Sequence, residues 1–182
     1  FQSYRDGNWE IYSMRTDGQD VRRLTNDPAA DGRPSQSPAG DRVAFVSNRS
    51  GNYEIYTMRV DGSDVRQLTN DPGEDNYPAW SPDGGRIIFA SDRTGSWDIV
   101  VMNADGSGGH TVVGGPQADY DPTWAPDGQR IAWIRMGEYR PNYGDVWQAK
   151  PDGTQTRVLV SQHLFLENLH WSPDSETVGY DF

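Results

Sequence analysis

The 182-residue sequence contains no cysteine and no long apolar run. Without cysteine, the chain can form neither a disulfide nor a thiolate zinc site. No apolar stretch approaches the roughly 20 residues that a membrane-spanning helix needs, so we expect no membrane insertion. Basic residues are also few: the chain has 16 Lys and Arg and 27 Asp and Glu, and its formal net charge is −11. Because this charge repels phosphate groups, we expect no nucleic-acid partner.

The sequence lacks the motifs of common catalytic centres. It has no Gly-x-Ser-x-Gly elbow, no P-loop and no dinucleotide-binding fingerprint. His163, Glu167 and His170 lie close together, but not with the His-Glu-x-x-His spacing that places two histidines one helical turn apart. We therefore predict that this chain is not an enzyme and has no cofactor of its own.

The dipeptide Asp-Gly recurs at a nearly fixed interval. Its aspartates are separated by 44, 44 and 47 residues: Asp17, Asp61, Asp105 and Asp152. The residue before Ser-Pro or Ala-Pro follows each of them after 19 residues, at Gln36, Trp80, Trp124 and Trp171. The three extra residues of the third interval fall in the segment Met136–Gly144. A period in the low forties is typical of a β-propeller blade.

Each repeat contains four short apolar segments separated by Pro, Asp and Gly. In the first complete repeat they are Arg33–Ser37, Arg42–Ser47, Tyr53–Met58 and Val65–Thr69. Alternation with period two predicts strands, and helical spacing is missing. We predict an all-β propeller of four-stranded antiparallel blades in a single domain, residues 1–182. Its repeats are approximately 1–25 (a half blade), 33–69, 77–113, 121–160 and 168–182 (a half blade).

The two ends of the sequence are complementary halves of one blade. The N-terminal half supplies a third and fourth strand, and the C-terminal half supplies a first and second strand. Since unpaired strand edges invite aggregation, we expect the halves to pair and close a ring of four blade equivalents. Two alternatives stay open: an eight-bladed ring of two chains, a homodimer that we favour slightly, and a piece of a larger propeller. The start on Phe1, within a repeat, indicates processing or truncation.

Turn residues follow the same period. The glycine of each Asp-Gly is expected to supply a positive φ between the third and fourth strands. Pro-Asp-Gly and Pro-Ala-Gly segments predict tight turns between the first and second strands. The last copy, Pro173-Asp174-Ser175, lacks the glycine.

Four carboxylates form a candidate cation site. Asp31, Asp75 and Asp119 precede the innermost strand of successive repeats, and Asp121 lies nearby. Oxygen ligands that converge at the entrance of a central channel suit Ca²⁺ or Mg²⁺. The alternative, which we favour, is that these aspartates form turns with their own backbone.

A second periodic set of charges precedes the third strand. Acids lie at Glu10, Glu54, Asp98 and Asp145, and in three repeats an arginine stands five residues earlier, at Arg5, Arg49 and Arg93. We predict that these arginines pair with the acids across a hairpin.

Aromatic residues provide two further candidates. Trp80, Trp124 and Trp171 can line a ligand site, but burial between blades is the simpler prediction, because each ring removes a large area from water. In the longer loop, Tyr139, Arg140 and Tyr143 form a candidate partner-contact patch, since Tyr and Arg are enriched at interaction hot spots. The alternative is a tolerated surface insertion.

The repeat resembles the TolB-type, WD40-like (PD40) β-propeller family. The segments that carry the resemblance are Pro78-Ala-Trp-Ser-Pro-Asp-Gly, Glu54-Ile-Tyr-Thr-Met and Arg66-Gln-Leu-Thr. Gln36 departs from the pattern, as do His110-Thr-Val-Val and the stretch from His163 to Leu169. The resemblance implies a non-catalytic scaffold for protein partners in a periplasmic or extracellular setting. The alternative that it implies is the accessory propeller of a prolyl-oligopeptidase-like hydrolase, which gates substrate access.

Overall fold

The computed structural model describes residues 1–137, 140–164 and 167–181. These residues form antiparallel sheets in chain order, and three of the sheets have four strands. The first of these contains β4 (Asp31–Gln36), β5 (Arg42–Ser47), β6 (Glu54–Arg59) and β7 (Arg66–Gln67). The second contains β8 (Asp75–Trp80), β9 (Arg86–Ser91), β10 (Asp98–Asn103) and β11 (His110–Val113). The third contains β12 (Asp119–Trp124), β13 (Ile131–Gly137), β14 (Arg140–Ala149) and β15 (Arg157–Leu164).

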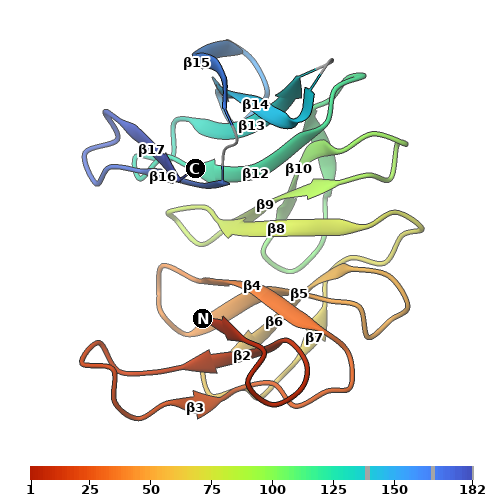
Figure 1. Ribbon diagram of the computed structural model, residues 1–182, viewed down its shortest axis with the longest axis vertical. Coiled ribbons are helices and arrows are strands. Elements are labelled where there is room, and N and C mark those ends of the chain that lie inside the picture. The colour runs from red at the N-terminus through yellow and green to blue at the C-terminus, as the bar shows by residue number, and fades with distance from the viewer. Residues whose placement is uncertain (138–139, 165–166, 182) are drawn as a thin grey trace.

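Two smaller sheets lie at the ends of the row. The N-terminal sheet contains β1 (Gln2–Ser3), β2 (Glu10–Ser13) and β3 (Arg22–Arg23). The last sheet contains β16 (Glu167–Trp171) and β17 (Val178–Asp181). In Figure 1 the sheets run from the N-terminal sheet at the bottom to the third complete sheet at the top, and β16 and β17 lie at the upper left, beside β12 and β13. The prediction of an all-β chain built from four-stranded antiparallel blades is confirmed. None of the described segments is a helix with the length and apolarity that a membrane crossing requires.

The turns have the expected backbone. The Asp-Gly turns place glycine at positive φ, as at Gly62 (85°), and the Pro-Asp-Gly turns do the same, as at Gly84 (70°). Ser175 occupies the equivalent position in the last sheet and adopts a φ of 63° without being glycine. Its hydroxyl accepts a hydrogen bond from the backbone N–H of Asp127 (3.0 Å), so a contact with the preceding blade holds this strained residue.

Apolar packing lies between neighbouring blades. The middle strands of a blade are buried on both faces; in β9, for example, Ile87, Ile88, Phe89 and Ala90 are all buried. One cluster joins Ile88 and Ile99 to Trp124 and Trp133 of the following blade, and the other clusters likewise join adjacent sheets. Each blade is therefore stabilised by its neighbours as much as by its own strand pairing.

The burial prediction for the tryptophans before Ser-Pro or Ala-Pro is met fully at Trp124 and in part at Trp80 and Trp171. Trp124 is buried, and Trp80 packs against the cluster of the first two complete blades. The Nε1–H of Trp80 donates to the carbonyl oxygen of Ser35 on the neighbouring inner strand (3.1 Å). Trp171, in the last sheet, is half-buried, with the Arg130 guanidinium over its ring (5.1 Å).

The prediction that the two half blades pair within one chain and close a ring is wrong. Among the described residues, no ladder joins β16 or β17 to the N-terminal sheet, and these sheets lie towards opposite ends of the molecule (Figure 1). The physical reason is the packing between blades. Close-packed apolar faces join each sheet to the next, and the last sheet packs its Leu169 against Ile134 and Val146 of the third complete blade. The two-chain ring and the larger propeller stay predictions.

Candidate functional site

One residue in each inner strand has a left-handed backbone although it is not glycine. These residues occupy the same position of successive repeats: Arg33 (φ 49°), Tyr77 (57°), Asp121 (49°) and Asn168 (52°). Each lies where the register between the first two strands of its sheet shifts. Because such a backbone costs about 1–2 kcal/mol in a residue with a Cβ, its recurrence marks this row as a candidate site. We call these four residues the inner rim, since the innermost strands of a propeller surround its axis.

The side chains of the inner rim connect neighbouring blades. The Arg33 guanidinium lies over the Tyr77 ring, with its carbon 3.8 Å from the ring centroid. The ring of Tyr77 meets that of Tyr120 at 6.1 Å, and Tyr120 lies 5.2 Å from Trp97. Asp121 accepts a hydrogen bond from the backbone N–H of Leu169 in the next sheet (2.9 Å). The rim therefore presents a cation, aromatic faces and a carboxylate along one series of inner strands.

The four predicted cation ligands are spread over three blades, and three of them are paired with arginine. Asp31, Asp75 and Asp119 are fully buried. They bind Arg49 (2.7 Å), Arg93 (3.0 Å) and Arg135 (2.7 Å), respectively. Burial raises the pKa of all three carboxyl groups, and the hydrogen bonds and charges of the arginines partly offset that effect.

The predicted pairing of Arg49 and Arg93 with the acids of the third strand is therefore wrong. Asp31 lies opposite Ser47 across the first two strands, and Arg49 follows Ser47 by two residues. The guanidinium accordingly reaches back to the inner strand of its own blade. In the N-terminal sheet, Glu10 does bind an arginine, but it is Arg23 of the fourth strand (2.5 Å).

The third-strand acids instead hold the segment that leads into the next blade. Glu54 accepts hydrogen bonds from the hydroxyl of Thr69 (2.6 Å) and from the backbone N–H of Asp71 (3.1 Å). Glu10 accepts the equivalent bonds from Thr25 and Asp27, and Asp98 accepts one from the backbone N–H of Gly115. Each of these three acids thus connects its own sheet to the segment that leads into the next sheet. Its role is therefore structural.

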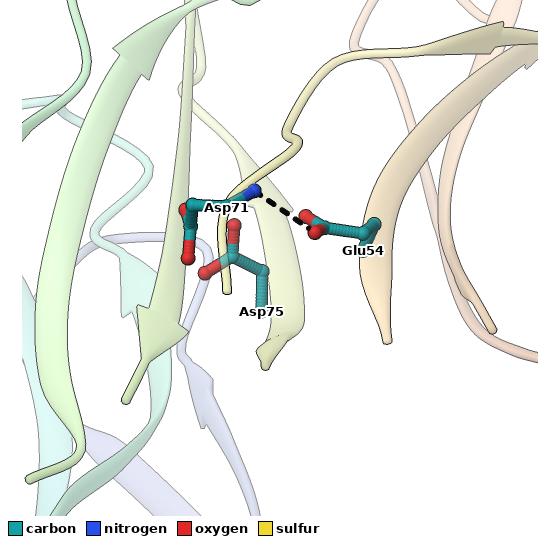
Figure 2. A group of neighbouring side chains, drawn as sticks. All are labelled: Glu54, Asp71 and Asp75. Atoms are coloured by element: carbon teal, nitrogen blue, oxygen red, sulfur yellow. Dashed lines mark hydrogen bonds between the residues drawn. The ribbon is translucent and has the colours of Figure 1, made fainter. Parts of the chain in front are cut away.

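One group of carboxylates has the spacing of metal ligands. Glu54, Asp71 and Asp75 each place an oxygen within 4.8 Å of the others, and Figure 2 shows the three side chains converging from the start of β6, the segment before β8 and the start of β8. Arg93 binds both Asp71 (2.9 Å) and Asp75 (3.0 Å), so a guanidinium already supplies positive charge here. In the part of the chain that is described, Asp31, Asp119 and Asp121 join no such group. A Ca²⁺ or Mg²⁺ ion at the predicted ligands stays a prediction.

The predicted partner-contact patch falls outside the described side chains. Tyr139 lies outside the described residues, and for Arg140 and Tyr143 the structure gives only the backbone of β14. The patch stays a prediction.

Sequence reasoning missed most of the inner rim. Of its four residues only Asp121 was a candidate, and then as a metal ligand. The available signal was positional: Arg33, Tyr77 and Asp121 each precede proline and are spaced by 44 residues. Because the side chains of these residues differ in type, a search for candidate binding residues by side-chain chemistry does not bring them together.

The family described as TolB beta propeller domain, PD40, matches residues 30–181. The chain belongs to this family. A TolB-type structure from Agrobacterium tumefaciens is 26% identical, with a TM-score of 0.80, and the match covers 97% of this chain and 67% of that one. TolB from Acinetobacter baumannii is also 26% identical, with a TM-score of 0.85, over 97% of this chain and 44% of that one.

A puromycin-hydrolysing peptidase of Mycobacterium tuberculosis is 14% identical, with a TM-score of 0.66. The match covers 88% of this chain and 25% of that one, and it shows a shared fold alone. The present chain thus spans less than half of the A. baumannii protein and a quarter of the peptidase.

Proposed function

We propose that this propeller is a non-catalytic scaffold that binds a protein partner through its inner rim, in a periplasmic or extracellular setting. The observation that carries the proposal is the row of left-handed, non-glycine residues at Arg33, Tyr77, Asp121 and Asn168. A backbone strain that recurs in four sheets requires compensation, and a binding surface is a common reason for it. Membership of the TolB propeller family supports the setting and the class of partner.

The chemistry of the rim also favours a protein ligand. Tyr and Arg are the side chains most often found at interaction hot spots, and Arg33 and Tyr77 lie face to face here. A net charge of −11 disfavours polyanions, so the basic group on the rim suits a carboxylate of a protein better than a nucleic acid. The accessory propeller of a hydrolase is the alternative, and it rests on shared fold.

An affinity capture tests the proposal. The immobilised chain is incubated with an envelope extract of a Gram-negative bacterium, beside the double variant Arg33→Ala/Tyr77→Ala. A matched control carries Val60→Ala/Val65→Ala, at two exposed residues away from the inner rim. We expect a defined protein to be retained by the wild type and the control, and to be reduced about tenfold by the rim variant. Equal retention by all three chains, or none by the wild type, contradicts the proposal.

A further inference from the structure

A tryptophan ends the inner strand of three sheets, and at two of them an arginine of the preceding blade covers its ring. The Arg86 guanidinium lies over Trp124, with its carbon 4.6 Å from the centre of a ring. Arg130 lies over Trp171 in the same way, at 5.1 Å. Both arginines are the residue just before or at the start of the second strand of their blade, and they are 44 residues apart. A cation on the tryptophan is therefore a repeated feature of these junctions.

The junction between the first two complete blades lacks this cation. Arg42 is the equivalent of Arg86, and Trp80 is the tryptophan that it would cover. The Arg42 guanidinium instead donates to the carboxylate of Asp64 (3.0 Å), to the backbone oxygen of Asp64 (3.3 Å) and to the hydroxyl of Thr57 (3.3 Å). Among the described residues, no basic side chain lies over the ring of Trp80, whereas Trp124 and Trp171 each have one.

The residue at the position of Asp64 explains the difference. This position is Gly108 in the next repeat and Gln155 in the one after it. Neither residue offers a carboxylate to the arginine of its blade. The side chains of Arg42 and Asp64 are only 23% and 28% exposed, so their ion pair is partly shielded from water and holds the arginine firmly. Asp64 thus keeps Arg42 away from Trp80.

The ring of Trp80 is fixed in its orientation. It packs against the apolar cluster of the first two complete blades, and its Nε1–H donates to the carbonyl oxygen of Ser35 (3.1 Å). The side chain is nevertheless only half-buried. A ring that is already ordered binds a ligand without a further loss of side-chain freedom. Indole is also the aromatic group that attracts cations most strongly.

We propose that the open face of Trp80 binds an arginine side chain of a partner protein. The guanidinium of the partner takes the place that Arg86 and Arg130 occupy at the next two junctions, and the net charge of −11 favours the approach of a basic segment. Trp80 is the last residue of β8 and lies beyond the rim residue Tyr77. The proposal therefore adds a second contact surface to the inner rim and does not depend on it.

Two acetylated and amidated tripeptides test the chemistry: Gly-Arg-Gly and Gly-citrulline-Gly. Citrulline has the shape of arginine without its charge. Each peptide is titrated into the ¹⁵N-labelled chain, and the indole N–H signal of Trp80, assigned with Trp80→Phe, is followed by NMR. We expect the arginine peptide to shift this signal and to bind about two- to fivefold more tightly than the citrulline peptide. Equal affinity for both peptides, or no shift of the Trp80 signal, overturns the proposal.

Asp64→Gly tests why the ring is open, because it gives the first complete blade the residue that the second blade has. We expect Arg42 to move onto Trp80, as Arg86 lies on Trp124, and the preference for the arginine peptide to be lost. The circular dichroism spectrum shows whether the variant is folded. An unchanged preference in folded Asp64→Gly contradicts the proposal.

The converse variant keeps the test decisive if Asp64→Gly does not fold. In Gly108→Asp, the new aspartate stands where the backbone φ is 68°, close to the 54° of Asp64. We expect it to draw Arg86 away from Trp124, so that the indole signal of Trp124 also responds to the arginine peptide. No response of Trp124 in this variant contradicts the role of the aspartate.

The rim variant Arg33→Ala/Tyr77→Ala separates this inference from the proposed function. We expect it to bind the arginine peptide as the wild type does, because Trp80 and Arg42 are unchanged. A lost response in this variant contradicts a surface that is independent of the rim. If the peptides fail while the affinity capture still depends on Arg33 and Tyr77, the Trp80 surface is wrong and the scaffold function stands.

Discussion

At the scale of single residues, left-handed backbones recur at one position of the outer hairpin. Asp20, Asp64 and Gln155 have φ values of 55°, 54° and 58°, and the repeat between the last two has Gly108 (68°). Asp64 accepts hydrogen bonds from Arg42 (3.0 Å) and Arg66 (2.9 Å), which offset its strain. Gln155 is exposed, and among the described residues its side chain takes part in no hydrogen bond or ion pair. Its strain is thus the least compensated of the series.

We expect Gln155→Gly to raise the free energy of unfolding by about 0.5–1 kcal/mol. Relief of the left-handed strain contributes about 1–2 kcal/mol, and the greater freedom of glycine in the unfolded chain removes part of that gain. Urea unfolding measures the change. The matched substitution Asp64→Gly removes the acceptor of two arginines, and we expect it to be destabilising. A loss of stability in Gln155→Gly would show that the strain argument is wrong.

The buried aspartates give a second prediction at this scale. Burial raises the pKa of Asp75 above its ordinary value of 3.8. A carboxyl group whose pKa is raised by folding contributes stability below its unfolded pKa and loses it as the pH rises through the folded value. Asp75→Asn removes this titration. We therefore expect the stability of the wild type relative to Asp75→Asn to decrease as the pH rises above the ordinary value of 3.8.

Asp61 is the control, because hydrogen bonds from Ser63 lower its pKa. A lowered pKa reverses the sign, so the stability of the wild type relative to Asp61→Asn should increase as the pH rises towards the ordinary value of 3.8 and then level off. Urea unfolding at several pH values measures both differences. The same sign for Asp75 and Asp61 would contradict the assignment of burial as the cause.

At the scale of elements, the Asp-Gly turn is also a contact between blades. A Cβ on Gly62 would lie 2.5 Å from the carbonyl oxygen of Leu24, and one on Gly106 would lie 2.8 Å from that of Leu68. Each of these oxygens belongs to the fourth-strand region of the preceding sheet. Gly18, in the N-terminal sheet, has a similar φ of 80°, but no atom lies within 4 Å of its would-be Cβ. The Asp-Gly turn therefore requires glycine for two reasons: the positive φ of the turn, and the close approach of the preceding sheet at Gly62 and Gly106.

A comparison of Gly62→Ala with Gly18→Ala separates the cost of backbone strain from the cost of overlap with the preceding sheet. We expect Gly18→Ala to cost about 1 kcal/mol from backbone strain alone. Gly62→Ala should cost about 1–3 kcal/mol more, because the methyl group overlaps the neighbouring blade. Thermal or urea unfolding gives both values. Equal costs would show that the turn does not pack against the preceding blade.

Much of the element scale could be predicted from the sequence. The segments Arg42–Ser47 and Arg86–Ser91 coincide with β5 and β9 because alternation and turn chemistry are local signals. The inner strand was expected from Arg33 but begins at Asp31, where the backbone N–H donates to the carbonyl of Trp9 in the preceding sheet (2.8 Å). Hydrogen bonds of this kind join residues that are far apart in the sequence, so no local sequence pattern predicts them. The partner of Arg49 was missed for the same reason.

At the scale of the whole molecule, the described sheets form a series in which the first and last sheets do not pair with each other. The apolar clusters lie between adjacent sheets, so each junction stabilises its neighbours and the molecule is held together blade by blade. The sequence predicts the blades because their period is local. It does not predict the rotation between blades, which depends on how side chains such as Trp133 and Phe89 interlock.

A ring of two chains makes a prediction about mass. If the half blades of two copies pair, size-exclusion chromatography with light scattering should give about twice the chain mass of 20.4 kDa. A mass of 20.4 kDa at micromolar concentration would contradict the two-chain ring.

The proposed scaffold function requires that the inner rim is the surface that contacts a partner. Site-specific photocrosslinking tests it most directly: p-benzoylphenylalanine is placed at Tyr77 on the rim or at Val65, an exposed outer position, and each chain is irradiated in the envelope extract. We expect a discrete protein adduct from position 77 and none from position 65. An adduct from position 65 alone would contradict it.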